Sequence, residues 1–206
     1  MNQKFISENK LVIRKVLNSE DSLDITKNFI ESILNISIKK IILNPNLLKI
    51  KENLSIEQNL EIIEVRIVTD KDEEINVGIQ FVDEQNIKTQ LLTYYMKIHA
   101  NQLKYNENRK LARTLTINIL DFIYFASLKY DKKIKIDCKD KNINLEEMEF
   151  YIIELPKFKN ITAEKMNLKE EWIIYLKGSN KKKIENIKND KIKKLDKLLD
   201  DYINNK

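Results

Sequence analysis

The chain has 206 residues, and its 37 Lys and Arg against 32 Asp and Glu give a formal net charge of +5. Its two glycines are too few for the glycine-rich phosphate loop of a Rossmann or P-loop protein, and its single cysteine and single histidine exclude a disulfide framework, a cysteine-based zinc site and a two-histidine metal motif. Hydrophobic residues make up 42% of the chain, which is enough to build a folded core.

The N-terminal part of the chain predicts two helices followed by a strand. Apolar residues at helical spacing indicate helices over 5–17 and 23–34, and Asp21 or Ser22 is placed to cap the second one. The run IKKIIL at 38–43 is typical of a strand and is followed by the turn sequence Asn-Pro-Asn.

Two alternating segments then predict a β-hairpin. Residues 61–68 and 75–82 alternate apolar and polar side chains, and the segment TDKDEE between them is typical of a turn. Because side chains point to opposite faces along a strand, one face of the hairpin is apolar and the other is polar. The polar face collects Glu64, Arg66, Asn76, Gly78 and Gln80.

The following part predicts a helix over 87–103, a buried strand over 114–121, a strand pair at 133–138 and 148–154, and a helix over 163–177. Helices and strands therefore occur in mixed order, which indicates an α/β sandwich around a central sheet. We expect His99 to be a surface or packing residue of its helix, and Cys138 to be a reduced, packed thiol.

The positive charge of the chain lies in its last thirty residues. Residues 177–206 hold ten lysines and five acidic residues, which leaves 27 residues of each sign in 1–176. Ile184, Ile187, Ile192, Leu195, Leu199 and Tyr202 recur near the helical period, so this segment predicts an amphipathic helix. We expect one domain over 1–177, with 178–206 as a basic helix packed on it or extending from it.

The lysines of this helix have two interpretations. They form a solvated face, or they bind a nucleic acid or an acidic protein partner. The candidate binding residues are Lys181, Lys182, Lys183, Lys188, Lys191 and Lys194. A further alternative is a homodimer that uses the apolar stripe of 184–202 as its interface.

The chain shows no sign of a membrane or a secretory location. No apolar run approaches the roughly 18 residues that a membrane span requires. The N-terminal sequence MNQKFISENK also lacks the apolar segment of a signal peptide. We therefore expect a soluble, cytoplasmic protein without a membrane partner.

Four stretches of the chain occur in an order that points to one protein family. They are residues 30–46, which include the turn LNPN, the hairpin segment NVGIQ at 76–80, LTINILDF at 115–122, and 150–158, which end in ELPKF. In this order they resemble the PD-(D/E)XK nuclease family transposases, also called recombination-promoting nucleases. The resemblance implies a restriction-endonuclease-like α/β fold with a central mixed sheet flanked by helices.

The resemblance also implies where a catalytic site is expected. In that family the hairpin presents an Asp on its first strand and Glu-x-Gln on its second, and the carboxylates hold Mg²⁺, which activates water. The Asp position falls on Glu64, the Glu position on Gly78 and the Gln position on Gln80. Glu64 and Gln80 are thus the remaining candidate catalytic residues, and Glu64 is the only candidate metal ligand.

These departures lead to two hypotheses about function. Glu64 and Arg66 give the polar face a charge near zero, so a hard dication has little reason to bind there. The first hypothesis is a degenerate, inactive nuclease-fold protein from a mobile element or phage, which needs no cofactor and acts by binding a nucleic acid or a protein, for example as an inhibitor or regulator. The alternative is a divergent, active DNA endonuclease that uses Mg²⁺, with a strand bulge supplying a substitute carboxylate.

Overall fold

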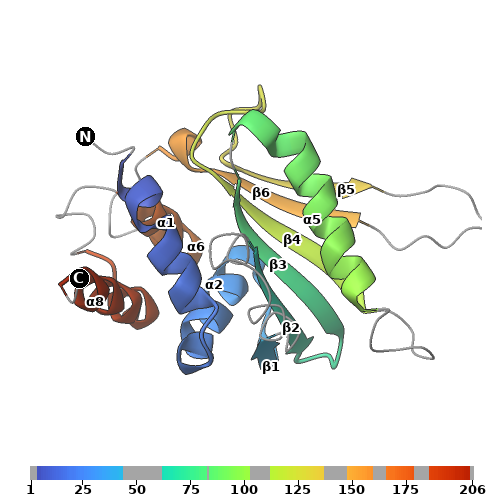
Figure 1. The fold of residues 1–206 in the computed structure, drawn as a ribbon, viewed down its shortest axis with the longest axis horizontal. Coiled ribbons are helices and arrows are strands. Elements are labelled where there is room, and N and C mark those ends of the chain that lie inside the picture. Colours follow the sequence, from blue (N-terminus) through green and yellow to red (C-terminus); the bar gives the residue numbers. More distant parts are fainter. Residues whose placement is uncertain are drawn as a thin grey trace, which may run out of the picture.

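The computed structural model describes residues 4–43, 62–82, 84–102, 112–136, 148–159, 166–178 and 186–204. The helices and strands in these ranges follow the mixed order expected from the sequence (Figure 1). They are α1 (Lys4–Leu17), η1 (Glu20–Ser22), α2 (Leu23–Leu34), β1 (Ile38–Leu43), β2 (Ile62–Thr69), β3 (Glu74–Val82), η2 (Glu84–Asn86), α5 (Ile87–Asn101), β4 (Arg113–Leu120), β5 (Asp131–Ile136), β6 (Met148–Glu154), η4 (Leu155–Lys157), α6 (Leu168–Leu176) and α8 (Asp190–Asn204).

The strands form one six-stranded sheet in the order β1-β2-β3-β4-β6-β5. β4 runs parallel to both of its neighbours, β3 and β6, whereas the other strand pairs are antiparallel. The mixed sheet with flanking helices is the fold class that the sequence predicts, and β1 and β5 are its two edges.

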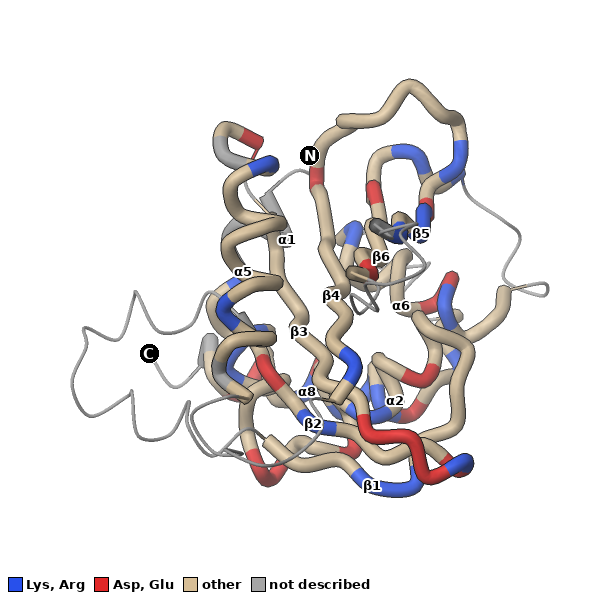
Figure 2. The backbone as a smooth tube through the Cα atoms, turned by 90° about the vertical axis from the view of Figure 1, so that its right-hand side faces the viewer, with Lys and Arg blue, Asp and Glu red and all other residues tan. Residues whose placement is uncertain are grey.

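The described helices cover the two faces of this sheet unequally. α5 crosses one face, and α1, α2, α6 and α8 lie on the other (Figures 1 and 2). The main core forms between the sheet and these four helices, from apolar residues such as Ile63 and Ile67 of β2 and Ile117 of β4. A smaller cluster beneath α5 includes Tyr95 and Phe150. The predicted apolar face of the hairpin is therefore the face that meets the larger core.

α6 shows how a local sequence sets a helix boundary. The helix begins at Leu168, later than expected, because Asn167 and Glu170 form a capping box. The Asn167 side chain accepts the Glu170 N–H at 3.0 Å, and the Glu170 carboxylate accepts the Asn167 N–H at 2.9 Å. Trp172 then packs edge-on to Phe29 of α2, with ring centroids 5.1 Å apart, which joins α6 to α2.

The apolar side of α8 lies in the core of the chain. Ile187, Ile192, Leu195 and Leu199 are each no more than 2% exposed, and α8 contacts α1 and α2. Glu171 of α6 fixes the approach to the helix, since its carboxylate oxygens accept the N–H groups of Lys188 and Asn189 at 3.0 Å each. These four apolar residues of the predicted stripe are thus covered by the chain itself, and an interface between two copies would need other residues.

Ion pairs between α2 and α8 add a pH-dependent contribution to stability. Burial on its own raises the pKa of Asp24, but hydrogen bonds from Lys191 and Lys194 outweigh it and lower the pKa from 3.8 to about 2. A pKa that folding lowers stabilises the fold above the unfolded value, and this stabilisation is lost as pH falls through the folded value. Because the Asp24 side chain is 39% exposed, we expect these ion pairs to contribute less than about 1 kcal/mol to the free energy of unfolding.

The expected result is that Asp24→Asn lowers the free energy of unfolding near neutral pH, and that its difference from wild type disappears as pH falls from about 4 to about 2. Denaturant titrations at several pH values measure this difference. Asp21→Asn, at an exposed position with no ion pair in the described part of the chain, is the control. A difference for Asp24→Asn that persists at low pH would contradict the assignment.

No helix in the described ranges combines the length and the apolar character that crossing a membrane requires.

Candidate functional site

The polar face of the β2–β3 hairpin lies beneath α5. β2 and β3 pair so that Glu64 stands opposite Gly78 and Arg66 opposite Asn76, and Gln80 lies one position further along the same face. Glu64, Asn76 and Gln80 are buried. The structure therefore brings the two candidate catalytic residues, Glu64 and Gln80, onto one face, on neighbouring strands, as the sequence pattern predicts.

β4 adds a row of polar side chains to this face that the sequence analysis missed. Thr114, Thr116 and Asn118 are buried beside β3, and Asn118 pairs in register with Gln80. The Gln80 amide donates to the Asn118 side-chain oxygen, and Asn118 Nδ2 donates to Thr116 Oγ1 at 3.0 Å and to the Tyr151 carbonyl at 3.1 Å. The alternation of these polar residues with apolar ones along β4 is the signal that could have identified them.

The end of α5 covers one end of this polar face. His99 Nδ1 lies 3.1 Å from Thr114 Oγ1, and the imidazole stacks on Tyr95 with ring centroids 6.0 Å apart. Gln102 donates to Thr114 Oγ1 at 3.0 Å and accepts the Ala112 N–H at 2.8 Å, which ties the helix end to the start of β4. These contacts make His99 a packing residue, which is one of the two alternatives that the sequence leaves open. Cys138 lies outside the described residues.

Ile98 of α5 occupies the space above Gly78. A Cβ atom placed on Gly78 would lie 2.2 Å from Ile98 Cδ1, which is far inside van der Waals contact, and 3.4 Å from Thr116 Cγ2. Ile98 is fully buried. The backbone of Gly78 does not have a positive φ, so nothing in its conformation requires glycine. The terminal methyl group of Ile98 fills the volume beside Gly78, so a side chain at this position would require Ile98 to move.

The side chains of this face do not fit a magnesium ion. Among the described residues, Glu64 is the only carboxylate near the centre of the polar face, and Arg66 beside it carries the opposite charge. Glu74 lies on the same face but four residues from Gly78 along β3, roughly 13 Å away. The described residues contain no group of three or more His, Cys, Asp or Glu that could hold a metal. These described side chains therefore do not supply the ligands of a magnesium site.

Two polar atoms of this face are buried without a hydrogen-bond partner in the described part of the chain. They are the oxygen Oε1 of Gln80 and the nitrogen Nδ2 of Asn76. Arg66 Nε lies 3.4 Å from the other polar atom of the Asn76 amide, so only one end of that side chain is satisfied. Unsatisfied buried polar atoms are uncommon, which distinguishes this face from an ordinary core surface.

The candidate lysines that the structure describes, Lys188, Lys191 and Lys194, lie on the other side of the sheet. Lys191 and Lys194 donate to Asp24 of α2 at 2.8 and 2.9 Å, so part of their charge is neutralised. Lys188 is exposed just before α8. Lys181, Lys182 and Lys183 lie outside the described residues. The hairpin face and the lysine helix are thus two separate surfaces.

The ELPKF segment holds a loop in place. Glu154 is buried and its Oε1 accepts the N–H groups of Tyr124 and Phe125 at 2.6 and 3.0 Å. Its Oε2 pairs with Lys157, which also donates to the Phe125 carbonyl. The segment therefore fixes residues 121–130, which follow β4, and its charged residues have a structural role.

The structural role of Glu154 leads to a testable prediction. Glu154→Gln replaces the oxygen that faces the buried Lys157 with an N–H₂ group, so the ammonium loses its charged partner. We expect a loss of about 1–3 kcal/mol in the free energy of unfolding, measured by denaturant titration. Glu84→Gln, at an exposed position, should change it by less than about 0.5 kcal/mol. Equal effects of the two substitutions would refute the role of Glu154.

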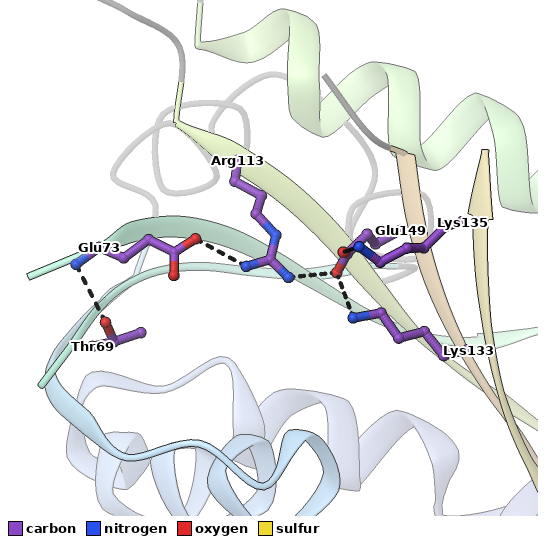
Figure 3. A network of polar contacts seen from close by, with 6 residues as sticks. All are labelled: Thr69, Glu73, Arg113, Lys133, Lys135 and Glu149. Carbon is purple, nitrogen blue, oxygen red and sulfur yellow. Dashed lines mark hydrogen bonds and ion pairs between the residues drawn. The ribbon is translucent and has the colours of Figure 1, made fainter. Parts of the chain in front are cut away.

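Glu149 is another buried carboxylate, and three cations lie around it near the start of β4 and β6 (Figure 3). It pairs with Arg113 at 2.5 Å, with Lys133 at 3.2 Å and with Lys135 at 3.0 Å. Arg113 also bonds Glu73 at 2.9 Å. Burial on its own raises the pKa of Glu149, but the hydrogen bonds from Arg113 and the lysines outweigh it and lower the pKa. The cluster carries more positive than negative charge.

Comparison with known proteins relates nearly all of the described fold to one family. A family model described as PD-(D/E)XK nuclease family transposase matches residues 8–203. No curated protein and no solved structure matches the chain. The matched region includes both the β2–β3 hairpin and α8.

Proposed function

The chain belongs to the PD-(D/E)XK nuclease family transposases, and we propose that it is a degenerate, catalytically inactive member that acts by binding a nucleic acid or a protein partner. Its setting in this proposal is a mobile element or phage, where an inactive nuclease fold can serve as an inhibitor or regulator. A fold carries a function only through its site, so the proposal depends on the residues of the hairpin face.

The observation that carries the proposal is the packing of Ile98 against Gly78. The family's catalytic Glu has no side chain here, and a Cβ atom at this position would lie 2.2 Å from Ile98 Cδ1. Loss of the carboxylate alone could be compensated by a carboxylate from another position. The apolar side chain of Ile98 also occupies the space beside this position, so a metal and its water would need Ile98 to move.

Metal-dependent hydrolysis of a phosphodiester needs a bound ion that activates water and stabilises the leaving oxygen. Mg²⁺ is usually held by one or two carboxylates together with water and substrate phosphate. One carboxylate, Glu64, beside the cationic Arg66 is a poor basis for such a site. These side chains support binding without cleavage.

One observation favours the alternative, a divergent and active DNA endonuclease that uses Mg²⁺. Gln80 keeps the family Gln and Glu64 keeps the charge of the family Asp, and Gln80 Oε1 is buried without a partner in the described residues. A site that retained chemistry would present such an atom to a ligand. Under this alternative a carboxylate from elsewhere completes the site.

A plasmid-nicking assay decides between the two. We expect no Mg²⁺- or Mn²⁺-dependent nicking by the purified chain above the level given by Glu64→Ala. Nicking that depends on metal and disappears in Glu64→Ala would overturn the proposed inactivity and restore the endonuclease. The Glu64→Ala control is essential, because a contaminating nuclease would be unaffected by the substitution.

A further inference from the structure

The segment between β4 and β5 presents large apolar side chains to solvent. Residues 121–130, with the sequence DFIYFASLKY, form an arch beyond the end of β4 (Figures 1 and 2). Within it, Ile123 is 60% exposed, Tyr124 is 40% exposed and Leu128 is 91% exposed. A single exposed apolar residue is ordinary on a protein surface, but a concentration of them in one short loop is typical of an interaction site. We call residues 121–130 the β4–β5 arch.

Buried groups hold the backbone of the β4–β5 arch in one shape. The buried Glu154 carboxylate accepts the N–H groups of Tyr124 and Phe125, and the Lys157 ammonium donates to the Phe125 carbonyl. Near the other end of the arch, the Tyr130 carbonyl accepts the Glu154 N–H at 2.7 Å. A loop that is fixed before binding loses less conformational entropy when a partner docks on it.

Attachment to the core accounts for only some of the apolar side chains of the arch. Phe122 and Phe125 pack against the cluster beneath α5. Tyr130 packs edge-on to Phe158, with ring centroids 5.0 Å apart. Leu128, by contrast, is almost fully exposed, so it does not contribute to this attachment. The arch therefore combines side chains that anchor it with side chains that are presented outward.

The charged residues around the arch leave an excess of positive charge. Its first residue, Asp121, pairs with Lys10 of α1 at 3.6 Å. Asp131, directly after the arch, pairs with Lys169 of α6 at 3.0 Å. Both of these carboxylates are thus neutralised. Lys129 is exposed, and no Asp or Glu in the described part of the chain lies within ion-pair distance of it.

The chemistry of the arch defines the partner that it fits. Lys132 supplies a second cation beside the arch, since its Nζ lies 4.3 Å from the centre of the Phe125 ring. We propose that the β4–β5 arch is a docking site for a protein whose contact surface combines large apolar side chains with a rim of Asp or Glu. The apolar side chains cover the three exposed ones of the arch, and the rim carboxylates pair with Lys129 and Lys132.

Other occupants fit these observations less well. Insertion into a membrane depends on apolar area and on attraction to anionic lipids, and it needs no fixed backbone. A second copy that packed arch against arch would bring Lys129 and Lys132 of both copies together. A nucleic acid would gain few phosphate contacts from two lysines, and Ile123 and Leu128 offer no ring on which a base could stack.

This inference rests on the proposed function and names the class of partner that the chain binds. The test is selection of peptides from a phage-displayed library of short random sequences, with the purified full chain as the target and EDTA present. The selected peptides should be richer in Asp, Glu and large apolar residues than the unselected library. One selected peptide is then labelled, and its binding is measured by fluorescence anisotropy.

The arch variant Ile123→Ser/Leu128→Ser should bind the labelled peptide at least about tenfold more weakly than the wild-type chain. The matched control, Leu92→Ser/Met96→Ser, removes two half-exposed apolar side chains from α5 and should bind within about twofold of wild type. Because all four side chains are exposed, both variants should unfold at the wild-type temperature. Lys129→Glu tests the rim separately, and its loss of binding should shrink as salt is added.

Selected peptides without acidic residues, no selected peptides, or equal binding by the arch variant and the control would overturn the proposal. Two parallel measurements separate the other occupants. Binding to phosphatidylserine vesicles that only the arch variant loses would assign the arch to a membrane, and self-association that only this variant loses would assign it to a second copy. Either result overturns the acidic partner. Because EDTA prevents cutting, failure of the arch leaves the proposed inactivity untouched, and nicking leaves the arch untouched.

Discussion

Gly78→Ala should destabilise the wild-type chain and stabilise a chain that carries Ile98→Ala. In the wild-type chain the added methyl group meets Ile98 Cδ1 at 2.2 Å, so we expect a loss of about 1–3 kcal/mol from overpacking. Ile98→Ala alone should cost about 2–5 kcal/mol, because Ile98 is fully buried. With the Ile98 side chain truncated, Gly78→Ala should raise the free energy of unfolding by about 0.5–1 kcal/mol, since glycine within a strand is entropically unfavourable.

Denaturant titration of the four chains in this double-mutant cycle measures the reversal directly. The matched control is a second cycle with Leu92→Ala in place of Ile98→Ala, because Leu92 lies on the same helix but is 50% exposed. Gly78→Ala and Leu92→Ala should be additive within about 0.5 kcal/mol. If Gly78→Ala has the same effect with and without Ile98, the contact between these two residues does not explain the glycine.

Leu195→Ala should show that α8 is part of the folded core. Leu195 is fully buried on a helix that contacts α1 and α2, so we expect the substitution to cost about 2–5 kcal/mol of the free energy of unfolding. That is a large fraction of the roughly 5–15 kcal/mol that stabilises an ordinary domain. Thermal and denaturant unfolding should remain a single transition at lower stability.

Lys197→Ala is the matched control, because it truncates an exposed side chain on the same helix. It should change the free energy of unfolding by less than about 0.5 kcal/mol. If Leu195→Ala also left the free energy of unfolding unchanged, α8 would not be part of the folded core. Its apolar residues would then be available to contact another chain.

The sequence predicted the hairpin well because its pattern is local. Alternation along β2 and β3 decided which face each side chain occupies, and the structure confirms that Glu64 and Gly78 share one face. The pattern could not show what lies above Gly78. Ile98 belongs to the next helix along the chain, and its place over the hairpin depends on how α5 crosses the sheet.

The charge distribution shows the limit of counting along a sequence. The count of basic and acidic residues assigned all the excess positive charge to the last thirty residues and gave residues 1–176 a net charge of zero. The fold instead gathers lysines of the balanced part, such as Lys129 and Lys169, around one cavity. In the C-terminal helix it places Lys191 and Lys194 against Asp24, which lies more than 160 positions earlier in the chain. Local charge depends on such long-range contacts, which a residue count cannot include.

The most direct test of the account is calorimetric titration of Mn²⁺ and Mg²⁺ into the purified chain. The account predicts no saturable heat from either ion, because Glu64 is the only described carboxylate at the centre of the site and Ile98 fills the space over Gly78. Glu64→Ala, titrated in parallel, should be indistinguishable from the wild-type chain. One-site binding by the wild-type chain that Glu64→Ala abolishes would contradict the account and return the hairpin face to metal chemistry.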